Sequence, residues 1–472
     1  MEPALFPHQA TLLRDAQQAY LRGARAVLMV MPTGAGKTFT FAKATQLACE
    51  KGRRVLLLAH RRELIEQISR ALWAFEVRHG IIAPDFDFSS CDVQIASIPT
   101  LVRRWYPGRY AFDLIVIDEA HHAVSGSGLA TILDGLPDAK RLGVTATPCR
   151  LDGRGLGIEA GGFFDALVQG PSVLELIEQG YLARPVVYAP PESTGPDLRS
   201  VKVVAGDYAP GQLEKVMNQS PLIGDAVSHY QRLCPGQPAI AFCVTVEHAE
   251  QVAWQFQQAG FRAAALSGQT QDGLRAQMIK NLGQGTLHVL TSCNVVSEGT
   301  DIPIVSAAIL LRPTASKALA MQQIGRVLRI HPGKEKALIL DHAGNTRRHG
   351  LPTEPSDWTL EGRPKGARRD FEGARTKECP NCGVSLATNA RQCPECGQAF
   401  SVADLPLPVA GDLEEVDAVA VARAKRQEVA QARTLDELQM IGRQRGYRAG
   451  WAHHVWRERQ HNEEWQQRRG YG

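Results

Sequence analysis

The segment MPTGAGKT, residues 31–38, contains the residue types of a phosphate-binding loop. Gly34 and Gly36 would let backbone N–H groups turn toward an anion. Lys37 would reach the β- and γ-phosphates of a nucleotide, and the Thr38 hydroxyl would ligate Mg²⁺. Met31 stands where the most familiar spacing of such loops has its first glycine, so a glycine turn with a chance Lys-Thr pair remains the alternative. The loop residues that we predict to contact a nucleotide are Thr33, Gly34, Ala35, Gly36, Lys37 and Thr38.

Two adjacent carboxylates follow the apolar run LIVI further along the chain. Asp118 and Glu119 open the tetrad DEAH at residues 118–121. In phosphoryl transfer, one such carboxylate can hold Mg²⁺ while the other orients and deprotonates the attacking water. We therefore predict that Asp118 binds the metal and that Glu119 is the base. The alternative is a strand that merely ends in acidic residues.

Both segments depend on the elements around them for their position. From residue 1 to about 350, short apolar runs such as VLMVM, VLLLA and LIVI alternate with stretches of helical periodicity. This alternation is typical of a parallel sheet covered on both faces by helices. The pattern pauses between about 170 and 190 and then restarts with PAIAFCV, FRAAAL, LHVLTS, AAILLRP and KALILD. The sequence therefore predicts an α/β fold with two similar domains in tandem.

Five segments occur in an order that resembles motifs I, II, III, V and VI of the DEAD/DEAH-type superfamily 2 helicases. They are PTGAGKT (32–38), DEAH (118–121), TATP (145–148), SEGTDIP (297–303) and QQIGRVLR (322–329). The resemblance covers about residues 1–345. It implies two tandem RecA-like parallel-sheet domains that bind and hydrolyse ATP at their interface.

The same resemblance assigns roles at the far side of the nucleotide cleft. Arg326 and Arg329 map onto the arginine fingers of the family, with Gln322 beside the γ-phosphate. Because these residues lie far from the phosphate-binding loop in sequence, hydrolysis would require the two domains to close. Gly299 and Asp301 would line the cleft, with Asp301 near the ribose.

The N-terminal segment LFPHQ sits where the family has its adenine-reading Q motif. Gln9 would pair with the adenine edge, and Phe6 would stack on the ring. His8 stands where tyrosine is more usual. The alternative is the start of a surface helix near Pro7.

Several residues fall where the family contacts the backbone of a nucleic acid. AHRREL (59–64) resembles motif Ia, ASIPTL (96–101) resembles motif Ib, and Thr291 begins motif V. Such contacts go to phosphate and sugar, so they do not specify sequence. For each hydroxyl alone, capping of a loop is an equal alternative. The residues predicted to touch nucleic acid are His60, Arg61, Arg62, Ser97, Thr100 and Thr291.

The segments 145–157 and 324–350 resemble the RadD-like branch of DNA repair helicases and related phage helicases. This resemblance favours an ATP-dependent DNA helicase or translocase in repair or recombination, with ATP and Mg²⁺ as cofactors. The alternatives are an ATP-dependent RNA helicase and a nucleic-acid-binding ATP switch. A switch of this kind would recruit a repair or single-strand-binding partner through the C-terminal region.

Four of the ten cysteines form two C-x₂-C pairs, CPNC and CPEC, separated by ten residues. Four thiolates suit a closed tetrahedral site for structural Zn²⁺. A disulfide pair and an iron–sulfur cluster are the alternatives. The predicted zinc ligands are Cys379, Cys382, Cys393 and Cys396. The other six are predicted to be small core residues: Cys49, Cys91, Cys149, Cys234, Cys243 and Cys293.

Composition sets broad limits on this reading. A net charge of +4 permits a nucleic-acid partner but does not demonstrate one. The longest apolar runs are far shorter than the ~20 residues of a membrane span, and we see no signal peptide at the N-terminus, so we expect a cytoplasmic protein.

The sequence thus predicts five parts of the chain. Residues 1–182 and 183–350 would be the ATP-binding and C-terminal helicase domains, and 351–377 a linker rich in Pro, Gly and charge. Residues 378–400 would form a zinc ribbon-like segment and 401–472 a helical tail. In that tail Trp451, Trp456 and Trp465 would pack a small helical domain, with stacking on bases as the alternative.

Overall fold

The structure is a computed structural model. It describes residues 3–84, 86, 89–106, 108, 110–123, 128–150, 154–190, 196, 198, 201–204, 207–218, 222–293, 302–354, 358–361, 376–378, 385–387, 414–417, 426–445, 450–453 and 455–456. None of the helices in these ranges combines the length and the apolar character needed to cross a bilayer.

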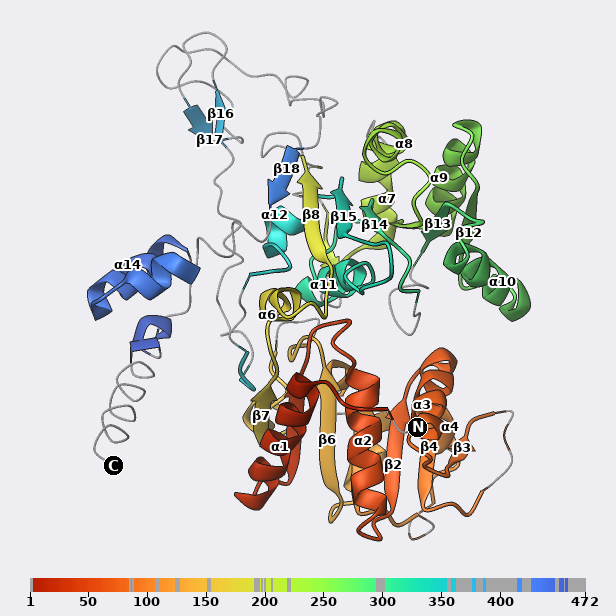
Figure 1. The fold of residues 1–472 in the computed structure, drawn as a ribbon, viewed down its shortest axis with the longest axis vertical. Helices are drawn as coiled ribbons and strands as arrows, with labels where there is room; N and C mark the ends of the chain where they lie inside the picture. The colour runs from red at the N-terminus through yellow and green to blue at the C-terminus, as the bar shows by residue number, and fades with distance from the viewer. Residues whose placement is uncertain are drawn as a thin grey trace. The chain divides into compact units, whose positions relative to one another are not determined.

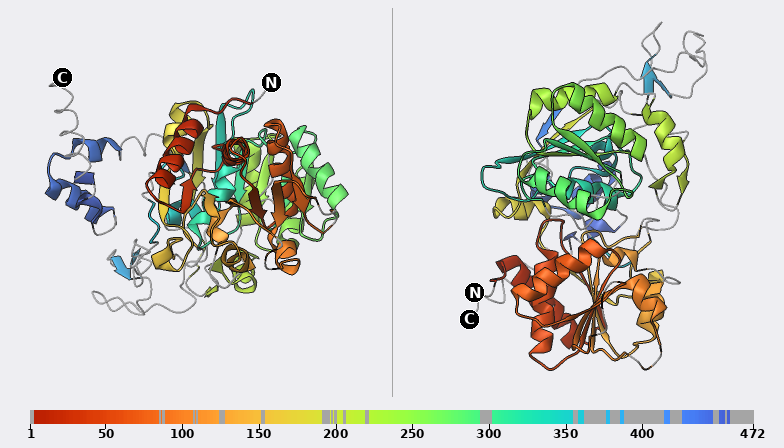
Figure 2. Two further views of the ribbon diagram at one scale, coloured as in Figure 1. Left: turned by 90° about the horizontal axis from the view of Figure 1, so that it is seen from below. Right: turned by 90° about the vertical axis from the view of Figure 1, so that its right-hand side faces the viewer.

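The first half of the chain forms a seven-stranded sheet in the order β3-β4-β2-β5-β6-β1-β7, and its strand pairs are parallel. Four central strands are buried along most of their length, so both faces of this sheet need covering. Figure 2 shows helices on both faces. The strands are β1 (Ala26–Val30), β2 (Val55–Ala59), β3 (Gly80–Ile82), β4 (Val93–Ser97), β5 (Leu114–Asp118), β6 (Lys140–Thr145) and β7 (Ala166–Gln169).

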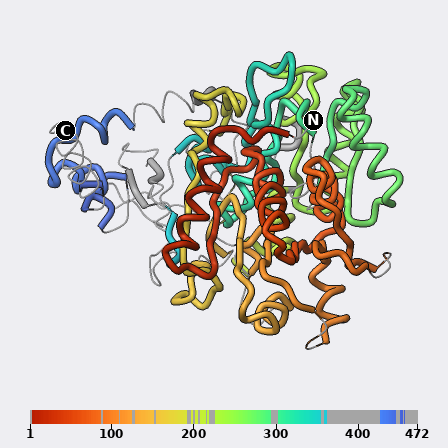
Figure 3. Tube along the Cα trace, turned by 60° about the horizontal axis from the view of Figure 1, so that its bottom comes forward, coloured from red at the N-terminus to blue at the C-terminus, as the bar shows by residue number. Residues whose placement is uncertain are grey.

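The helices of this first sheet mostly follow its strands along the chain. The N-terminal helix α1 contacts β1, β7 and α2, beside which it runs in Figure 3. These helices are α1 (Pro7–Leu21), α2 (Lys37–Cys49), α3 (Arg62–Ala74), α4 (Ile98–Arg103) and α5 (Gly128–Asp134), with 3₁₀ turns η1 (Ala120–His122) and η2 (Ile158–Ala160).

A second seven-stranded sheet has the order β12-β13-β11-β14-β15-β8-β18 (Figure 1). The pairs among its first six strands are parallel. Its strands are β8 (Arg184–Ala189), β11 (Ala239–Phe242), β12 (Ala263–Leu266), β13 (Val289–Ser292), β14 (Ala307–Leu310), β15 (Lys336–Asp341) and β18 (Glu414–Asp417). A short hairpin joins β9 (Val203–Val204) and β10 (Asp207–Tyr208). The helices are α6 (Val173–Glu178), α7 (Pro210–Asn218), α8 (Leu222–Leu233), α9 (Val246–Gln258), α10 (Asp272–Gly283), α11 (Lys317–Gly325) and α12 (Asn345–His349).

After the second sheet the chain comes back to the first one. Trp358 and Leu360 pack against the core of the first sheet, and the Leu360 carbonyl accepts a 2.8 Å hydrogen bond from the N–H of Gly157. Lys317 of α11 lies over the Trp358 ring, 5.8 Å from its centroid. We call residues 358–361 the return segment.

The C-terminal part contains two small structures. Strands β16 (Thr376–Glu378) and β17 (Ser385–Ala387) form an antiparallel pair. Residues 417–472 form a separate compact unit that contains α14 (Leu435–Gln444). Its buried cluster includes Leu438 and Ile441, against which Trp451 and Trp456 pack. The prediction that these two tryptophans pack a helical domain is therefore confirmed, while Trp465 lies outside the described residues.

The predicted α/β fold is confirmed: the apolar runs at 27–31, 55–59 and 114–117 and all five runs of the second block form strands. Residues 414–417 were expected to be helical but form a strand, because pairing beside β8 satisfies their backbone groups. Among the scattered cysteines, Cys234 and Cys243 are buried as predicted. The other four, Cys49, Cys91, Cys149 and Cys293, are only partly buried.

Candidate active site

Strand order alone brings three of the predicted motifs together. β5, β6 and β1 are neighbours in the first sheet, and each is followed directly by one motif: DEAH, TATP and the phosphate-binding loop. Because parallel strands end at the same edge, these three motifs meet at the carboxyl edge of the sheet, where open α/β sheets bind their ligands.

The phosphate-binding loop depends on its two glycines. Gly34 and Gly36 have φ angles of +89° and +82°, a region that favours glycine. At Gly36 an added methyl group would also lie only 2.2 Å from Nε2 of Gln9. Lys37 is the first residue of α2, so the loop ends at a helix N-terminus, which favours an anion.

The loop lysine faces the predicted base. Nζ of Lys37 lies 3.9 Å from Oε1 of Glu119, and both side chains are about one-tenth exposed. Glu119 has a left-handed backbone with φ +46°, which costs about 1–3 kcal/mol in a residue other than glycine. Its N–H donates a 2.9 Å hydrogen bond to Oδ1 of Asp118, which holds the Asp118 carboxylate against the backbone of Glu119.

A chain of polar contacts joins DEAH to TATP. Nδ1 of His121 lies 3.4 Å from Oε2 of Glu119 and 3.1 Å from Oγ1 of Thr145. Thr145 in turn donates to the Thr147 carbonyl at 3.1 Å. His121 thus lies between the base and the end of β6, in contact with Glu119 and hydrogen-bonded to Thr145.

The oxygen donors near the loop suit Mg²⁺. This ion binds proteins through one or two carboxylates and completes its octahedral shell with water and substrate phosphates. Asp118 and the Thr38 hydroxyl would supply two oxygen ligands, and Nε2 of Gln67 donates to that hydroxyl at 3.3 Å. In the part of the chain that the structure describes, no group of three or more His, Cys, Asp or Glu side chains could hold a metal by itself. Two oxygen donors of this kind fit Mg²⁺, which takes its other ligands from water and phosphate.

Gln9 is held against the loop. Its Nε2 donates to the carbonyls of Ala35 and Gly36 at 3.2 and 3.3 Å, and its Oε1 accepts from the N–H of Phe6 at 2.9 Å. His8 contacts the Ala35 carbonyl, and burial lowers the pKa of its imidazole, a shift which that contact opposes. The Phe6 ring is half exposed beside Tyr181, with centroids 4.7 Å apart.

The predicted finger helix of the second sheet lies on the phosphate-binding loop. Gly325, the last residue of α11, is so close to Thr33 that an added methyl group would lie 2.4 Å from the Cβ of Thr33. A methyl group added at Gly34 would lie 3.6 Å from Cγ of Arg329. Gln322 and Arg326 are buried here, and Nε2 of Gln322 has no hydrogen-bond partner in the structure. The structure thus brings Gln322, Arg326 and Arg329 near the loop that is more than 280 residues earlier in the sequence.

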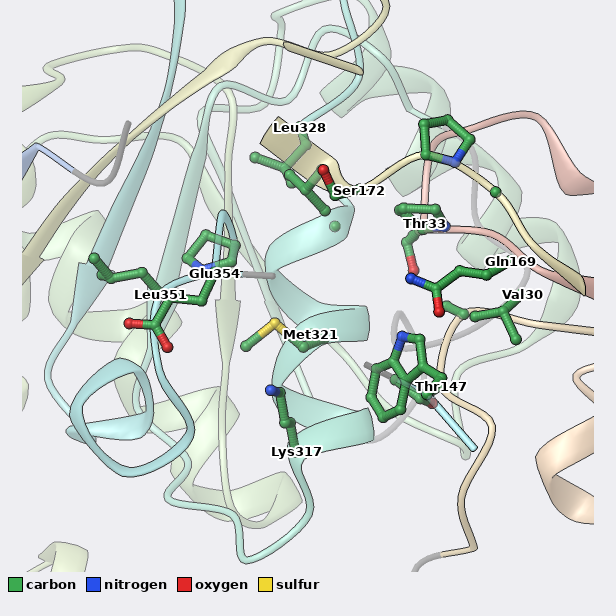
Figure 4. Close-up of a pocket in the computed structure, with 18 residues that line it drawn as sticks. Val30, Thr33, Thr147, Gln169, Ser172, Lys317, Met321, Leu328, Leu351 and Glu354 are labelled. Atoms are coloured by element: carbon green, nitrogen blue, oxygen red, sulfur yellow. The ribbon is translucent and has the colours of Figure 1, made fainter. Parts of the chain in front are cut away.

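A cavity of about 80 Å³ lies behind this contact (Figure 4). Its walls come from Thr33 of the loop, Thr147 of TATP, Met321 of α11 and the segment around Leu351. The Thr147 hydroxyl is buried there without a hydrogen-bond partner. The cavity is the space between the motifs of the two sheets.

The residues predicted to touch nucleic acid divide into two groups. His60 and Arg61 precede α3 and Arg62 begins it, where helix N–H groups would also face a phosphate. Arg62 lies 3.6 Å from Glu66, and both are exposed. In contrast, the Thr100 hydroxyl donates to the Ser97 hydroxyl at 3.3 Å, a bond between two side chains that caps no backbone group of α4.

Thr291 requires a correction. Its side chain is fully buried in β13, and its hydroxyl donates to the carbonyl of Ala249 at 2.7 Å. A hydroxyl inside the core cannot meet a phosphate at the surface, so the predicted contact is wrong for this conformation. Gly299, Asp301 and the four grouped cysteines lie outside the described residues.

Sequence reasoning missed a contact between the two sheets. Nη1 of Arg275, on α10, donates to Oε1 of Glu63 at 2.6 Å. Glu63 lies beside the predicted phosphate contacts of α3, so this ion pair fixes that surface to the second sheet. The two residues are 212 positions apart, and no local pattern links them.

Two family models match the chain in the regions of these motifs. Residues 2–150 match the family "Type III restriction enzyme, res subunit". Residues 225–331 match the family "Helicase conserved C-terminal domain".

Individual relatives extend the match across both sheets. The "51.5 kDa protein" of a Lactococcus phage is 31% identical over 375 residues, which cover 79% of this chain and 77% of the relative. "Putative ATP-dependent helicase IRC3" of Saccharomyces cerevisiae is 29% identical over 366 residues, and the match covers 71% of this chain but only 52% of that relative. Among solved structures, "ATP-dependent Type ISP restriction-modification enzyme LlaBIII bound to DNA" has a TM-score of 0.52 at 18% identity, over 76% of this chain and 28% of that one, which shows the shared fold. The chain belongs to the superfamily 2 helicases and is an ATP-hydrolysing enzyme.

Proposed function

We propose that this helicase is a DNA-dependent ATPase that translocates on or unwinds DNA during repair or recombination, in a RadD-like branch of its superfamily. In this proposal residues 1–182 and 183–350 are the two motor domains, and residues 351–377, 378–400 and 401–472 are the linker, zinc segment and tail.

The contact of α11 with the phosphate-binding loop is the main observation behind the proposed cycle of ATP binding and hydrolysis. Because Gly325 and Arg329 already lie against Thr33 and Gly34, a nucleotide on the loop would lie within reach of the second domain. Lys37 would bind its phosphates, and Glu119 would accept the proton of the attacking water. Mg²⁺ held by Thr38 and Asp118 would neutralise phosphate charge when bound.

Arg326 and Arg329 would stabilise the charge that develops during hydrolysis, a contribution worth about 10³–10⁵ in rate for arginine fingers generally. The unpartnered amide of buried Gln322 supports a polar ligand at the same place, since buried donors are normally satisfied. Loss of phosphate would remove the attraction between the domains, and this opening and closing would drive movement along the polymer.

Two observations favour DNA as the polymer. The first domain matches a family described by a restriction enzyme, a class of enzymes that cut DNA. The segments at 145–157 and 324–350 also resemble DNA repair helicases more than RNA-acting ones. Both point the same way, whereas the small net charge does not discriminate.

The test compares the ATPase rate without polymer and with single-stranded DNA, forked DNA and single-stranded RNA of equal length. We expect a large increase with DNA and a much smaller one with RNA. Equal stimulation by RNA would replace this proposal with an RNA helicase. No stimulation by any polymer would favour an ATP switch that acts through a protein partner.

We also propose that Cys379, Cys382, Cys393 and Cys396 hold one structural Zn²⁺. Strands β16 and β17 pair with Glu378 opposite Ser385, and the first C-x₂-C pair lies between these two residues in the sequence. Elemental analysis of the purified chain should find one zinc per molecule, and none in a Cys379→Ser, Cys382→Ser variant. Iron with visible absorption, or no metal in the wild type, would reject the proposal.

A further inference from the structure

One partly buried lysine outside the helicase motifs donates each of its three N–H groups to a backbone carbonyl. Nζ of Lys334 donates to the carbonyls of Val305, Arg329 and Pro303 at 2.6, 2.8 and 3.2 Å. An ammonium group has three N–H donors, so each donor has one acceptor. A neutral side chain of the same length cannot replace all three bonds.

Two of these three carbonyls belong to residues at the ends of predicted helicase motifs. Pro303 ends SEGTDIP, the predicted motif V, and Arg329 ends QQIGRVLR, the predicted motif VI. Lys334 follows Arg329 by one tight turn, in which its own N–H donates to the His331 carbonyl at 3.0 Å. The side chain therefore ties the end of one motif to the end of the other.

The backbone of Arg329 is also held from the opposite direction. Arg329 forms an isolated antiparallel bridge with Leu182, and the N–H of Ala183 donates to the Leu328 carbonyl at 2.7 Å. The Arg329 side chain passes the phosphate-binding loop at Gly34. Two anchors, Leu182 and Lys334, thus determine where this guanidinium enters the cleft.

Electrostatic effects on the Lys334 ammonium act in two directions. Burial, together with the Arg329 guanidinium, lowers the pKa of Lys334 to about 7. The carbonyl dipoles act in the opposite direction, because they favour the charged ammonium. Hydrogen bonds from an ionised donor are about twice as strong as neutral ones, so a charged group at this position fixes the backbone more firmly than a neutral one.

We propose that Lys334 is a positioning residue for ATP hydrolysis, which holds the backbone of Arg329 so that its guanidinium meets the transferred phosphate. The proposal rests on the proposed role of Arg329 as an arginine finger. Lys334 itself touches no reacting atom. It acts through Arg329, and its effect should therefore depend on that side chain.

The test is a double-mutant cycle in the full-length chain with Lys334→Met and Arg329→Ala. We expect Lys334→Met to lower kcat at least tenfold while KM for ATP stays within twofold. The double variant should be no slower than Arg329→Ala alone, because the anchor has nothing left to position. Lys336→Met is the matched control: this lysine is exposed two residues later, and its removal should leave kcat unchanged.

Normal kcat in Lys334→Met beside a slow Arg329→Ala would overturn the positioning role and leave the finger intact. Losses that multiply in the double variant would also overturn it, since they show independent effects. Normal hydrolysis in Arg329→Ala would reject both proposals together. If Lys334→Met does not fold, Lys334→Gln keeps two N–H donors without the charge, and the same kcat and KM comparison decides.

Discussion

Replacing Gly325 with alanine should separate stability from catalysis in this enzyme. Gly325 ends α11 without a positive φ, so alanine fits its backbone and should stabilise the helix by about 0.5–1 kcal/mol. The new methyl group, however, would lie 2.4 Å from Cβ and 2.7 Å from Cγ2 of Thr33. Ordinary contact at such a methyl begins near 3.4 Å, so α11 and the loop must move apart by about 1 Å.

A displacement of that size is large for a catalytic site, because the rate depends on the exact position of the reacting groups. A misplacement of ~1 Å can cost about 10²-fold in rate, which corresponds to about 2.7 kcal/mol in the activation barrier. We therefore expect Gly325→Ala to lower kcat about 100-fold in a steady-state ATPase assay with saturating polymer. The melting temperature should be equal to that of the wild type or higher.

The control is Gly283→Ala, which also places alanine at the end of a helix. Its nearest neighbour would be Cγ2 of Ile302 at 3.8 Å, an ordinary contact. This variant should hydrolyse ATP at the wild-type rate. If Gly325→Ala retains kcat within twofold, the two domains do not need this contact during hydrolysis, and the assignment of α11 as the finger helix fails.

Four further substitutions test the remaining assignments. Lys37→Ala should weaken nucleotide binding, as measured by fluorescent-nucleotide titration. Glu119→Gln should bind ATP normally and lose turnover, as measured by phosphate release. Normal hydrolysis in Glu119→Gln would show that Glu119 is not the base. Arg326→Ala should lower kcat at least 100-fold with little change in ATP affinity, and weak binding with normal kcat would make it a ground-state ligand instead. Arg61→Ala should reduce the slope of log affinity against log salt by about 0.7–0.9 and leave the polymer-free ATPase rate intact, and an unchanged slope would exclude a phosphate contact.

The pattern of apolar residues along the sequence predicted most of the buried strands and helices. Continuous apolar runs became buried parallel strands, and stretches of helical periodicity between them became helices such as α2, which begins at Lys37. Two strands were missed because they lie where the pattern pauses: β7, at an edge of the first sheet, and β8, between β15 and β18 in the second. Edge strands gain much of their stability from pairing with a neighbour, which a sequence pattern does not display.

Some site residues could be predicted from motifs in the sequence, whereas others depend on contacts that only the fold creates. Glu119 and Lys37 could be assigned to one site from their motifs, and the structure brings them together because β5 and β1 both pair with β6 and end at the same edge of the sheet. Thr291 was misassigned because all residues of β13 are buried, as expected for a parallel strand covered on both faces, and the motif does not show this burial. Lys334 could not be found from sequence at all, since its three acceptors are backbone carbonyls that any residue could supply.

The return segment changes what kind of movement the motor can make. The chain passes from the first sheet to the second between β7 and β8, and Leu360 then attaches the end of the second domain back to Gly157 of the first. A body attached to another at two separate places cannot slide freely away from it. Its easiest motion is a hinge rotation about the axis through the two attachment points. Leu360 would then be one of the two attachment points that define the axis of rotation. Leu360→Gly should make this axis less well defined while leaving the contact between Thr33 and Gly325 unchanged.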